Sequence, residues 1–145
     1  MVHLTAIIGA VFVATSCSGF TDSETGRVVG IISTGGPEPT VIEAPDTVQL
    51  GVAFAATVHS FGNGCTRADG VELTLEPALA RVTPFDRIPV DDDVVCADVL
   101  ARIPHPLELH FTVLGTATIV AEGMMSRASG EQIRVTVTKD IVVVP

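Results

Sequence analysis

The sequence predicts an all-β domain, an antiparallel β-sandwich of about seven to nine strands, with a small β-barrel as the alternative. Apolar and polar residues alternate along several short segments, and a period of two is typical of half-buried strands. Clusters of Gly, Pro, Asn and Asp separate these segments. No segment carries a helical apolar stripe over three turns, so short strands must build the whole core.

The predicted strands follow one another from residue 40 onwards. Residues 71–76, 107–113 and 133–138 alternate most regularly, so their apolar residues share one face. Further strands are expected at residues 40–43, 52–60, 80–82, 94–96, 117–122 and 141–144. The last of these runs is apolar enough to be covered on both faces. The chain is expected to turn or break at Gly62-Asn63-Gly64, Asp69-Gly70, Pro84, Pro89, Pro104, Pro106, Gly115 and Gly130.

The composition fits one domain and restricts its partners. The 145 residues include neither Trp nor Tyr, so the core must be built from Val, Ile, Leu, Ala and a few Phe. The formal net charge is -9 at pH 7. A chain this acidic repels phosphate groups, which disfavours nucleic acids and anionic membrane surfaces as partners.

The N-terminal segment predicts export from the cytosol. Residues 4–14 are apolar and uncharged. Such a run spans about 16 Å as a helix, which is too short for a bilayer core of about 30 Å but suits a signal peptide. Ala14 and Ser16 provide the small residues of a cleavage site just before Cys17. Residues 1–16 are therefore predicted to be a signal peptide.

The segment that ends at Cys17 resembles the lipobox of bacterial lipoproteins. The resemblance implies that a diacylglycerol is attached to the Cys17 sulfur and that the mature chain starts there. Ser18 follows, which by the same resemblance implies sorting to the outer membrane of the bacterial cell envelope, facing the periplasm or the exterior. A secreted protein without lipid and a cytosolic protein with a buried N-terminal element are the alternatives.

Residues 17–39 are predicted to be a flexible tether, because Ser, Thr, Gly, Asp, Glu and Pro dominate them. Within this tether, residues 28–32 form an apolar island that could make a short strand or pack on the domain. The folded domain is then expected to span residues 40–145.

The last third of the chain resembles the closing strands of bacterial immunoglobulin-like domains. The segment Gly115-Thr116-Ala117-Thr118-Ile119 matches a turn-and-strand element that precedes a final Val-x-Val strand, here Val135-Thr136-Val137. The resemblance implies an immunoglobulin-like β-sandwich. The missing Trp and Tyr make it a distant variant of that fold.

Cys65 and Cys96 are expected to form a disulfide. With Cys17 set aside for the lipid, two cysteines remain in a chain predicted to be exported, and such a pair is typical of a disulfide. The alternative is a zinc site that combines this pair with His105 and His110. The two cysteines lie too far apart in sequence for the usual ligand spacing, so we expect the disulfide and no bound metal.

Little in the sequence indicates catalysis or a cofactor. The run Asp91-Asp92-Asp93 offers oxygen atoms for calcium but lacks the spaced pattern of a recognised loop, so a solvated loop is expected. Ser60 follows His59, but neighbours on a strand point to opposite faces. His59 and His110 lie on polar strand faces and are expected to meet solvent. We therefore expect neither an enzyme nor a cofactor-binding protein.

These observations together predict a lipid-anchored envelope protein that presents an immunoglobulin-like binding or structural module. Its partner would be an envelope or surface protein or a glycan, bound through loops or a strand edge, with the lipid as the only membrane contact. The alternative is a periplasmic protein that binds a small ligand or a metal ion. An enzyme or a protease inhibitor that uses an exposed loop at residues 103–106 is a further possibility.

Overall fold

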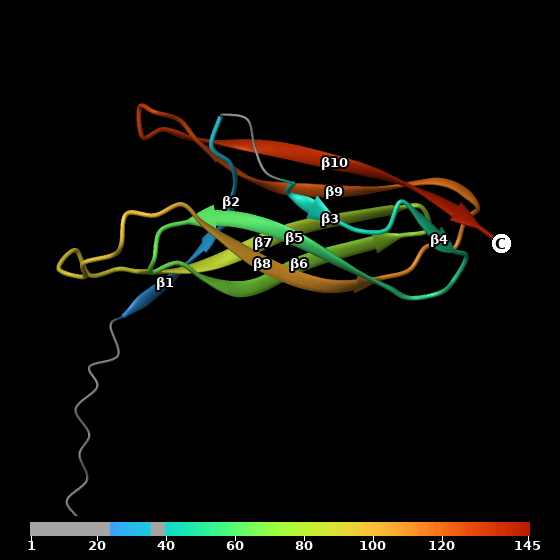
Figure 1. Cartoon of the computed structure of the whole chain (residues 1–145), viewed down its shortest axis with the longest axis horizontal. Coiled ribbons are helices and arrows are strands. Elements are labelled where there is room, and N and C mark those ends of the chain that lie inside the picture. The colour runs from blue at the N-terminus through green and yellow to red at the C-terminus, as the bar shows by residue number, and fades with distance from the viewer. Residues whose placement is uncertain (1–23, 36–39) are drawn as a thin grey trace, which may run out of the picture.

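The computed structural model describes residues 24–35 and 40–145, and every regular element in them is a strand. The strands are β1 (Thr25–Val29), β2 (Ile31–Ser33), β3 (Ile42–Glu43), β4 (Thr47–Gln49), β5 (Phe54–Gly62), β6 (Arg67–Glu76), β7 (Leu79–Pro89), β8 (Ala101–Leu109), β9 (Gly115–Ser126) and β10 (Gln132–Val144) (Figure 1). The predicted all-β class is confirmed. The predicted signal peptide and the lipid site Cys17 lie outside the described residues.

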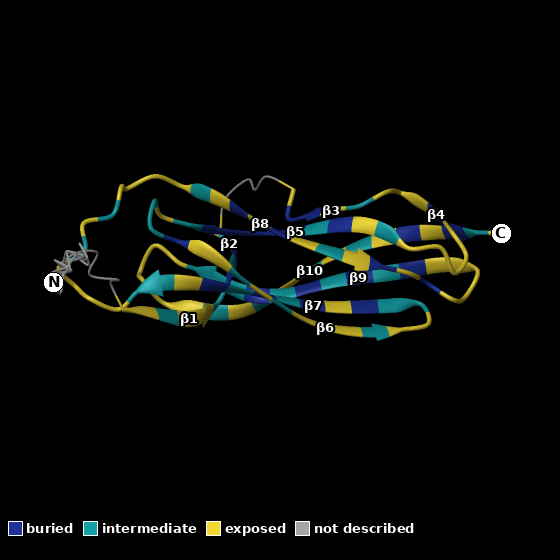
Figure 2. Ribbon diagram, turned by 90° about the horizontal axis from the view of Figure 1, so that it is seen from below, coloured by how far each residue is buried: buried dark blue, intermediate teal, exposed yellow. Residues whose placement is uncertain are grey.

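The strands form one curled sheet whose two halves pack face to face as an elongated sandwich (Figures 1 and 2). One half contains β3, β5 and β8, and the other contains β6, β7, β9 and β10. The short strand β2 connects the halves, because it pairs with both β5 and β9. A membrane-spanning helix is absent from the described part of the chain.

The sheet is mixed, whereas the sequence predicted a purely antiparallel one. Three pairs are parallel: β10 with β4, β2 with β9, and β7 with β9. The β7–β9 pair is parallel because the chain crosses to the other half as β8 between them and then returns. Alternating patterns reveal which residues are strands but not which strands become neighbours, so the sequence carried no signal for this difference.

The core lies between the two halves and is aliphatic apart from a few phenylalanines. The inward face of β9 is fully buried at Ala117, Ile119 and Ala121. The other half contributes Leu109 and Phe111 to the same core, and both are also fully buried. Buried residues alternate with half-buried ones along β9, and half-buried residues alternate with exposed ones along most of β10 (Figure 2). The C-terminal run is not covered on both faces as predicted, because Val142 is 51% exposed. The reason is that β10 has only one face against the core.

Three prolines predicted to break strands lie inside them. Pro104 and Pro106 belong to β8, whose single strand partner among the described residues is β5. At such an edge a proline nitrogen points away from the ladder and costs no hydrogen bond. Pro84 lies in β7 where pairing with β9 ends and pairing with β1 begins. Conversely, the strand predicted at residues 94–96 is irregular chain, because the disulfide and its loop hold that segment.

Ordered structure begins earlier than the predicted boundary at residue 40. Within the predicted tether, β1 pairs with β7, and β2 lies between β5 and β9. Ile32 is fully buried in the core. Gly123 of β9 makes this possible, because a Cβ atom there would lie 2.7 Å from the Ile32 side chain. The apolar island at residues 28–32 therefore belongs to the folded domain.

Candidate binding surfaces

The disulfide fixes two loops at one end of the sandwich, which we call the disulfide end. The structure joins Cys65 to Cys96 with their Cα atoms 5.4 Å apart, in agreement with the expected pairing. Cys65 lies in the turn after β5, and Cys96 lies in the loop of residues 90–100 between β7 and β8. The Gly64 N–H also donates a 3.0 Å hydrogen bond to the Ala97 carbonyl. The long loop is thus held at its middle.

The turn that carries Cys65 is built by its own polar residues. Asn63 Oδ1 accepts hydrogen bonds from the Cys65 N–H at 3.0 Å and from the Thr66 hydroxyl at 3.2 Å. The Asn63 N–H in turn donates to Thr66 Oγ1. Gly62 is required here, because a Cβ atom at that position would collide with the Thr66 side chain. The Gly-Asn-Gly sequence therefore encodes a rigid turn that presents Cys65 to its partner.

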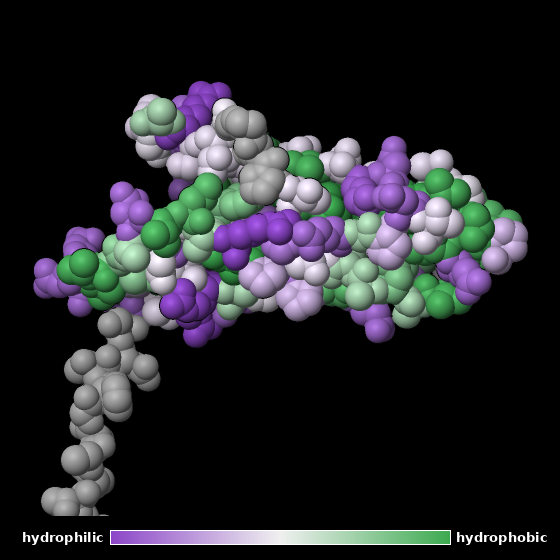
Figure 3. All heavy atoms as spheres, in the orientation of Figure 1, coloured by the Kyte–Doolittle hydropathy of each residue, from purple (hydrophilic) through white to green (hydrophobic). Residues whose placement is uncertain are grey.

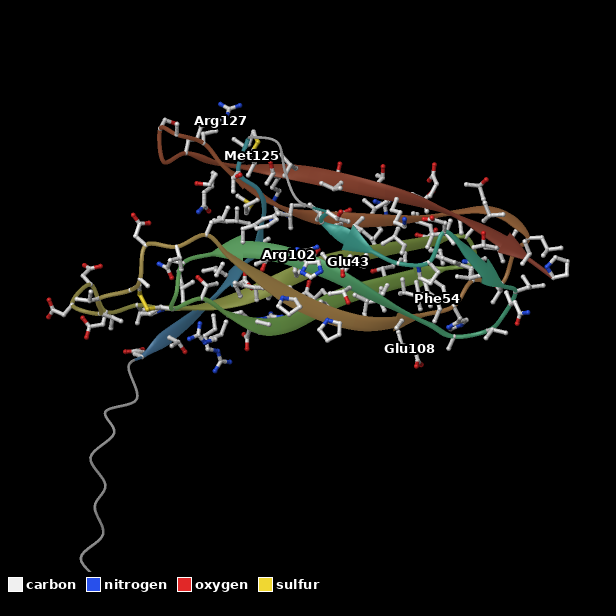
Figure 4. The ribbon with its side chains drawn as sticks, viewed as in Figure 1. Glu43, Phe54, Arg102, Glu108, Met125 and Arg127 are labelled. Atoms are coloured by element: carbon white, nitrogen blue, oxygen red, sulfur yellow. A yellow bond between two sulfur atoms is a disulfide. The ribbon has the colours of Figure 1, made fainter. Side chains whose placement is uncertain are left out.

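Two adjoining pockets open at the disulfide end, with volumes of about 350 and 330 Å³. Both are lined by Ile31 and Phe61. The first pocket also reaches Asp86, and the second is bordered by Leu100 and Arg127. Figure 4 shows Arg127 beside Met125 at the tip of the β9–β10 hairpin. The pockets have room for an apolar fragment next to a buried carboxylate.

A buried polar network lies behind the first pocket. Ser60 Oγ donates a 2.9 Å hydrogen bond to Asp86 Oδ1, and His105 Nε2 lies 2.9 Å from Ser60 Oγ and 3.1 Å from Asp86 Oδ1. His105 Nδ1 lies 3.2 Å from the Gly70 carbonyl, which can only accept, so Nδ1 is assigned as protonated. Nε2 faces acceptor oxygens as well. The three side chains therefore form one buried polar network that joins β5, β7 and β8.

This network contains the three residue types of a hydrolase triad but not its arrangement. In such a triad the histidine removes the serine proton while a carboxylate orients the far ring nitrogen. Here the serine hydroxyl donates to the carboxylate, and the far nitrogen of His105 faces a backbone carbonyl. Ser60 is also fully buried. The geometry favours a structural role, in which three strands are locked together through their polar side chains.

This network was not predicted, because Ser60 was compared only with its sequence neighbour His59. Asp86 lies 26 positions after Ser60 in the sequence, and His105 lies 45 positions after it. Their association depends on which strands face each other across the core. The one available signal was the alternation of β5, which places Ser60 on the same inward face as Ala56 and Val58.

His59 does not meet solvent, contrary to the prediction. It is only 6% exposed, because the segment at Val41 covers it and accepts its backbone N–H at 2.8 Å. Its Nε2 lies 3.3 Å from Glu43 Oε2, at ion-pair distance but without hydrogen-bond alignment, and its Nδ1 has no partner among the described residues. The other predicted solvent-facing histidine, His110, is exposed.

Glu43 is the negatively charged group beside His59, and it also pairs with Arg102. Arg102 donates a 2.7 Å hydrogen bond to Glu43 Oε1, and Figure 4 shows the two side chains next to each other across β3 and β8. Arg102, with His59 as the smaller contributor, lowers the pKa of Glu43 from its usual value of 4.5. The pair connects the short strand β3 to the edge strand β8 over the surface of β5.

We expect Glu43→Gln to reduce stability at neutral pH and to have no effect in acid. The folded-state pKa of Glu43 lies below its unfolded value, so its ionised form stabilises the fold above pH 4.5 and this contribution disappears as the pH falls through the lower folded-state pKa. Urea unfolding of the parent and the variant from pH 7 to pH 2.5 measures the difference. Glu108→Gln, at an exposed site without an ion pair in the described residues, is the control. A difference that persists or grows in acid contradicts this assignment.

The residues of the alternative metal sites are not brought together. Cys65 and Cys96 are bonded to each other, His105 is in the buried network, and His110 is exposed. Asp91, Asp92 and Asp93 lie on the exposed loop, where Asp91 accepts the Asp93 N–H. Within residues 24–35 and 40–145, no three Cys, His, Asp or Glu side chains are grouped as metal ligands.

Exposed apolar side chains lie at both ends of the sandwich. At the disulfide end they belong to the long loop, as Val90, Val95, Val99 and Leu100, and a second set lies at the opposite end. We call this set the far-end patch; it consists of Leu50, Val52, Val113, Leu114 and Val142. The loops that carry it are joined to the last strand, because the Leu50 N–H donates to the Val144 carbonyl and the Gly51 N–H donates to the Phe111 carbonyl. Figure 3 shows hydrophobic atoms gathered at this end. A grouped apolar surface of this kind is typical of an interaction site.

The chain enters the domain at the disulfide end, far from this patch. Thr25 pairs with Pro89, and the Glu24 carbonyl accepts the Val90 N–H at 3.0 Å, next to the start of the long loop. Figure 1 shows the start of β1 at that end, while the C-terminus lies at the other. Comparison with known protein families, with curated proteins and with solved structures finds no match to this chain.

Proposed function

We propose that this chain is an exported, lipid-anchored protein of a bacterial envelope that presents an immunoglobulin-like module to a protein partner. The observation that carries the proposal is that the chain entry and the far-end patch lie at opposite ends of the domain. The N-terminal chain enters at the disulfide end, and the far-end patch lies at the opposite end. Exposed apolar side chains are also present at the disulfide end. A chain held at a membrane by that end leaves the far-end patch turned outward and free to bind.

Two features support export. Cys17 follows an uncharged apolar run and small residues, as in bacterial lipoproteins. The Cys65–Cys96 disulfide would persist in an oxidising compartment and is uncommon in the reducing cytosol. Cys17 lies seven positions before Glu24. An extended chain of that length spans about 25 Å, which would keep the disulfide end near the membrane and the far end away from it.

The immunoglobulin-like assignment is supported by the two packed halves and by the long β9–β10 hairpin, which the resembling segment forms. The parallel β7–β9 pair is a departure from an antiparallel sandwich. A protein partner fits the far-end patch better than a glycan, because five aliphatic side chains offer desolvation and few hydrogen bonds.

We expect the protein extracted from membranes to begin at Cys17 and to carry acyl chains on that residue. Intact mass spectrometry before and after reduction reports the cleavage site, the lipid and the disulfide together. Cys17→Ser should move the protein from the membrane fraction to the soluble fraction. A native chain that retains Met1 and three free thiols would overturn the proposal.

The binding end is tested in the same cells with a photoreactive residue at position 114 or at position 108. The first lies in the far-end patch, and the second lies on the exposed side of β8 (Figure 4). We expect one defined crosslinked product from position 114, which should be lost when Val52→Asp is added. Equal crosslinking from both positions, or none from position 114, counts against the far end as the binding surface.

A further inference from the structure

Strand β10 has a long unpaired edge. On one side it pairs with β9 from Gln132 to Val143, while on the other side it pairs with β4 only at residues 142–144. The Val142 N–H points to this second side, where it donates to the Asp46 carbonyl. Because the direction alternates along a strand, the backbone groups of residues 134, 136, 138 and 140 point to the same side. Within the described residues these groups have no backbone partner there, and Figure 1 shows β10 at the boundary of the molecule.

Other edges of the sheet are protected against pairing. Pro104 and Pro106 remove two outward N–H groups from the edge of β8. In β6 the register shifts between Ala68 and Val71, and Gly70 adopts φ 90°, which interrupts a regular edge. Strand β10 contains neither proline nor register shift. Proline and register shifts are two of the devices by which soluble proteins prevent strand addition. A third device, an inward-pointing charge, is present on β10 as Lys139, but Asp46 of the same copy neutralises it, so this long edge remains able to pair.

We propose that β10 pairs with β10 of a second copy of this chain, antiparallel, about a twofold axis at Val137. In this register Arg134 lies opposite Asp140 of the second copy, and Thr136 lies opposite Thr138. Opposite charges and threonine pairs are favourable cross-strand partners. The backbone pairing ends at residue 140, before the edge that β4 occupies from residue 142. The second copy's chain before Arg134 must therefore turn away from β4.

The charge pattern is what favours a second copy over an unrelated strand. Arg134 and Asp140 have opposite signs and lie at equal distances along β10 from Val137, so the edge is complementary to itself. Both side chains are exposed, although Asp140 also accepts a 2.7 Å hydrogen bond from Thr118. The inward charge of Lys139 is neutralised within its own copy, where its Nζ lies 2.6 Å from Asp46.

The half-buried residues on the other face of β10 would extend the core across the axis. Val135 and Val137 are only partly covered within one copy. In the dimer Val137 would meet Val137 of the second copy, which removes more apolar surface from water. The interface is short, so the dimer is expected to be weak and to depend on concentration. This inference does not rest on membrane anchoring.

Sedimentation velocity of the full chain tests the proposal, with Cys17→Ser in every variant to prevent disulfide exchange. The parent should pass from monomer to dimer as its concentration rises. Thr136→Pro should remain a monomer throughout, because it removes one outward N–H and no internal hydrogen bond. Glu108→Pro makes the same change on the edge of β8 and should associate like the parent. A parent that stays monomeric, or a Thr136→Pro chain that still dimerises, overturns the proposal.

Charge reversal tests the register. Arg134→Asp places like charges opposite each other twice in one dimer, so the dissociation constant should rise about tenfold or more. Arg134→Asp combined with Asp140→Arg should restore dimerisation. If the single variant dimerises like the parent, or if the double variant fails to recover while it unfolds at the parent's urea midpoint, this register is wrong.

Discussion

Replacement of His105 by alanine is expected to lower the free energy of unfolding by about 3–5 kcal/mol, the largest effect of any single substitution that we predict. The imidazole is buried between Ser60, Asp86 and the Gly70 carbonyl. Its removal leaves the Asp86 carboxylate buried with only the Ser60 hydroxyl as its partner. The cost is that of an uncompensated buried charge, which exceeds the cost of the cavity alone.

Urea unfolding of His105→Ala and His110→Ala provides the measurement and its control. His110 is exposed on the chain just after β8 and should change stability by no more than about 0.5 kcal/mol. Asp86→Ala should be severe too, but the double variant should cost much less than the two single variants added together, because each variant removes the same ion pair. Equal losses for the two histidines, or additive losses for His105 and Asp86, would contradict a structural network.

Loss of the disulfide is expected to cost about 3–4 kcal/mol, since Cys65 and Cys96 close a loop with a sequence separation of 31. The effect arises mainly in the unfolded chain, which gains conformational freedom when the link is removed. That is a large share of the stability of a domain of this size. The loss of unfolding free energy should be measurable, because the core lacks Trp and Tyr and has no large contacts of these side chains to compensate for it.

A reductant separates the bond from the substitution. The free energy of unfolding of the parent should fall on reduction to that of the Cys65→Ser/Cys96→Ser variant, and the variant itself should not respond to the reductant. The turn at Asn63 should survive, because its hydrogen bonds to Thr66 are independent of the sulfur atoms. A parent that is equally stable with and without reductant would show that the link contributes nothing.

Several features of the fold could be predicted because they depend on local pattern. The run at residues 117–122 was predicted to be a strand and lies within β9, and the alternation at residues 133–138 identified the half-buried face of β10. The separated cysteines suggested a link that the structure contains. In each case the information lies in side-chain periodicity or in residue type, which neighbouring strands do not change.

Other features were mispredicted because they depend on distant neighbours. Pro104 and Pro106 looked like breakers, but β8 is an edge strand that tolerates them. His59 looked solvent-facing, but the chain at Val41 covers it. The network of Ser60, Asp86 and His105 was not predicted, because the alternation of β5 marks only Ser60 and three strands must meet before its atoms come within hydrogen-bond distance.

Residue pattern and residue type are enough to predict that this protein is built from strands, which residues of β10 turn inward, and that Cys65 pairs with Cys96. Which strands became neighbours, which edge was left open, and which polar residues were buried together depended on the three-dimensional fold. The physical reason is that strand periodicity is set within a few residues, whereas pairing and burial are set by contacts between segments far apart in the chain.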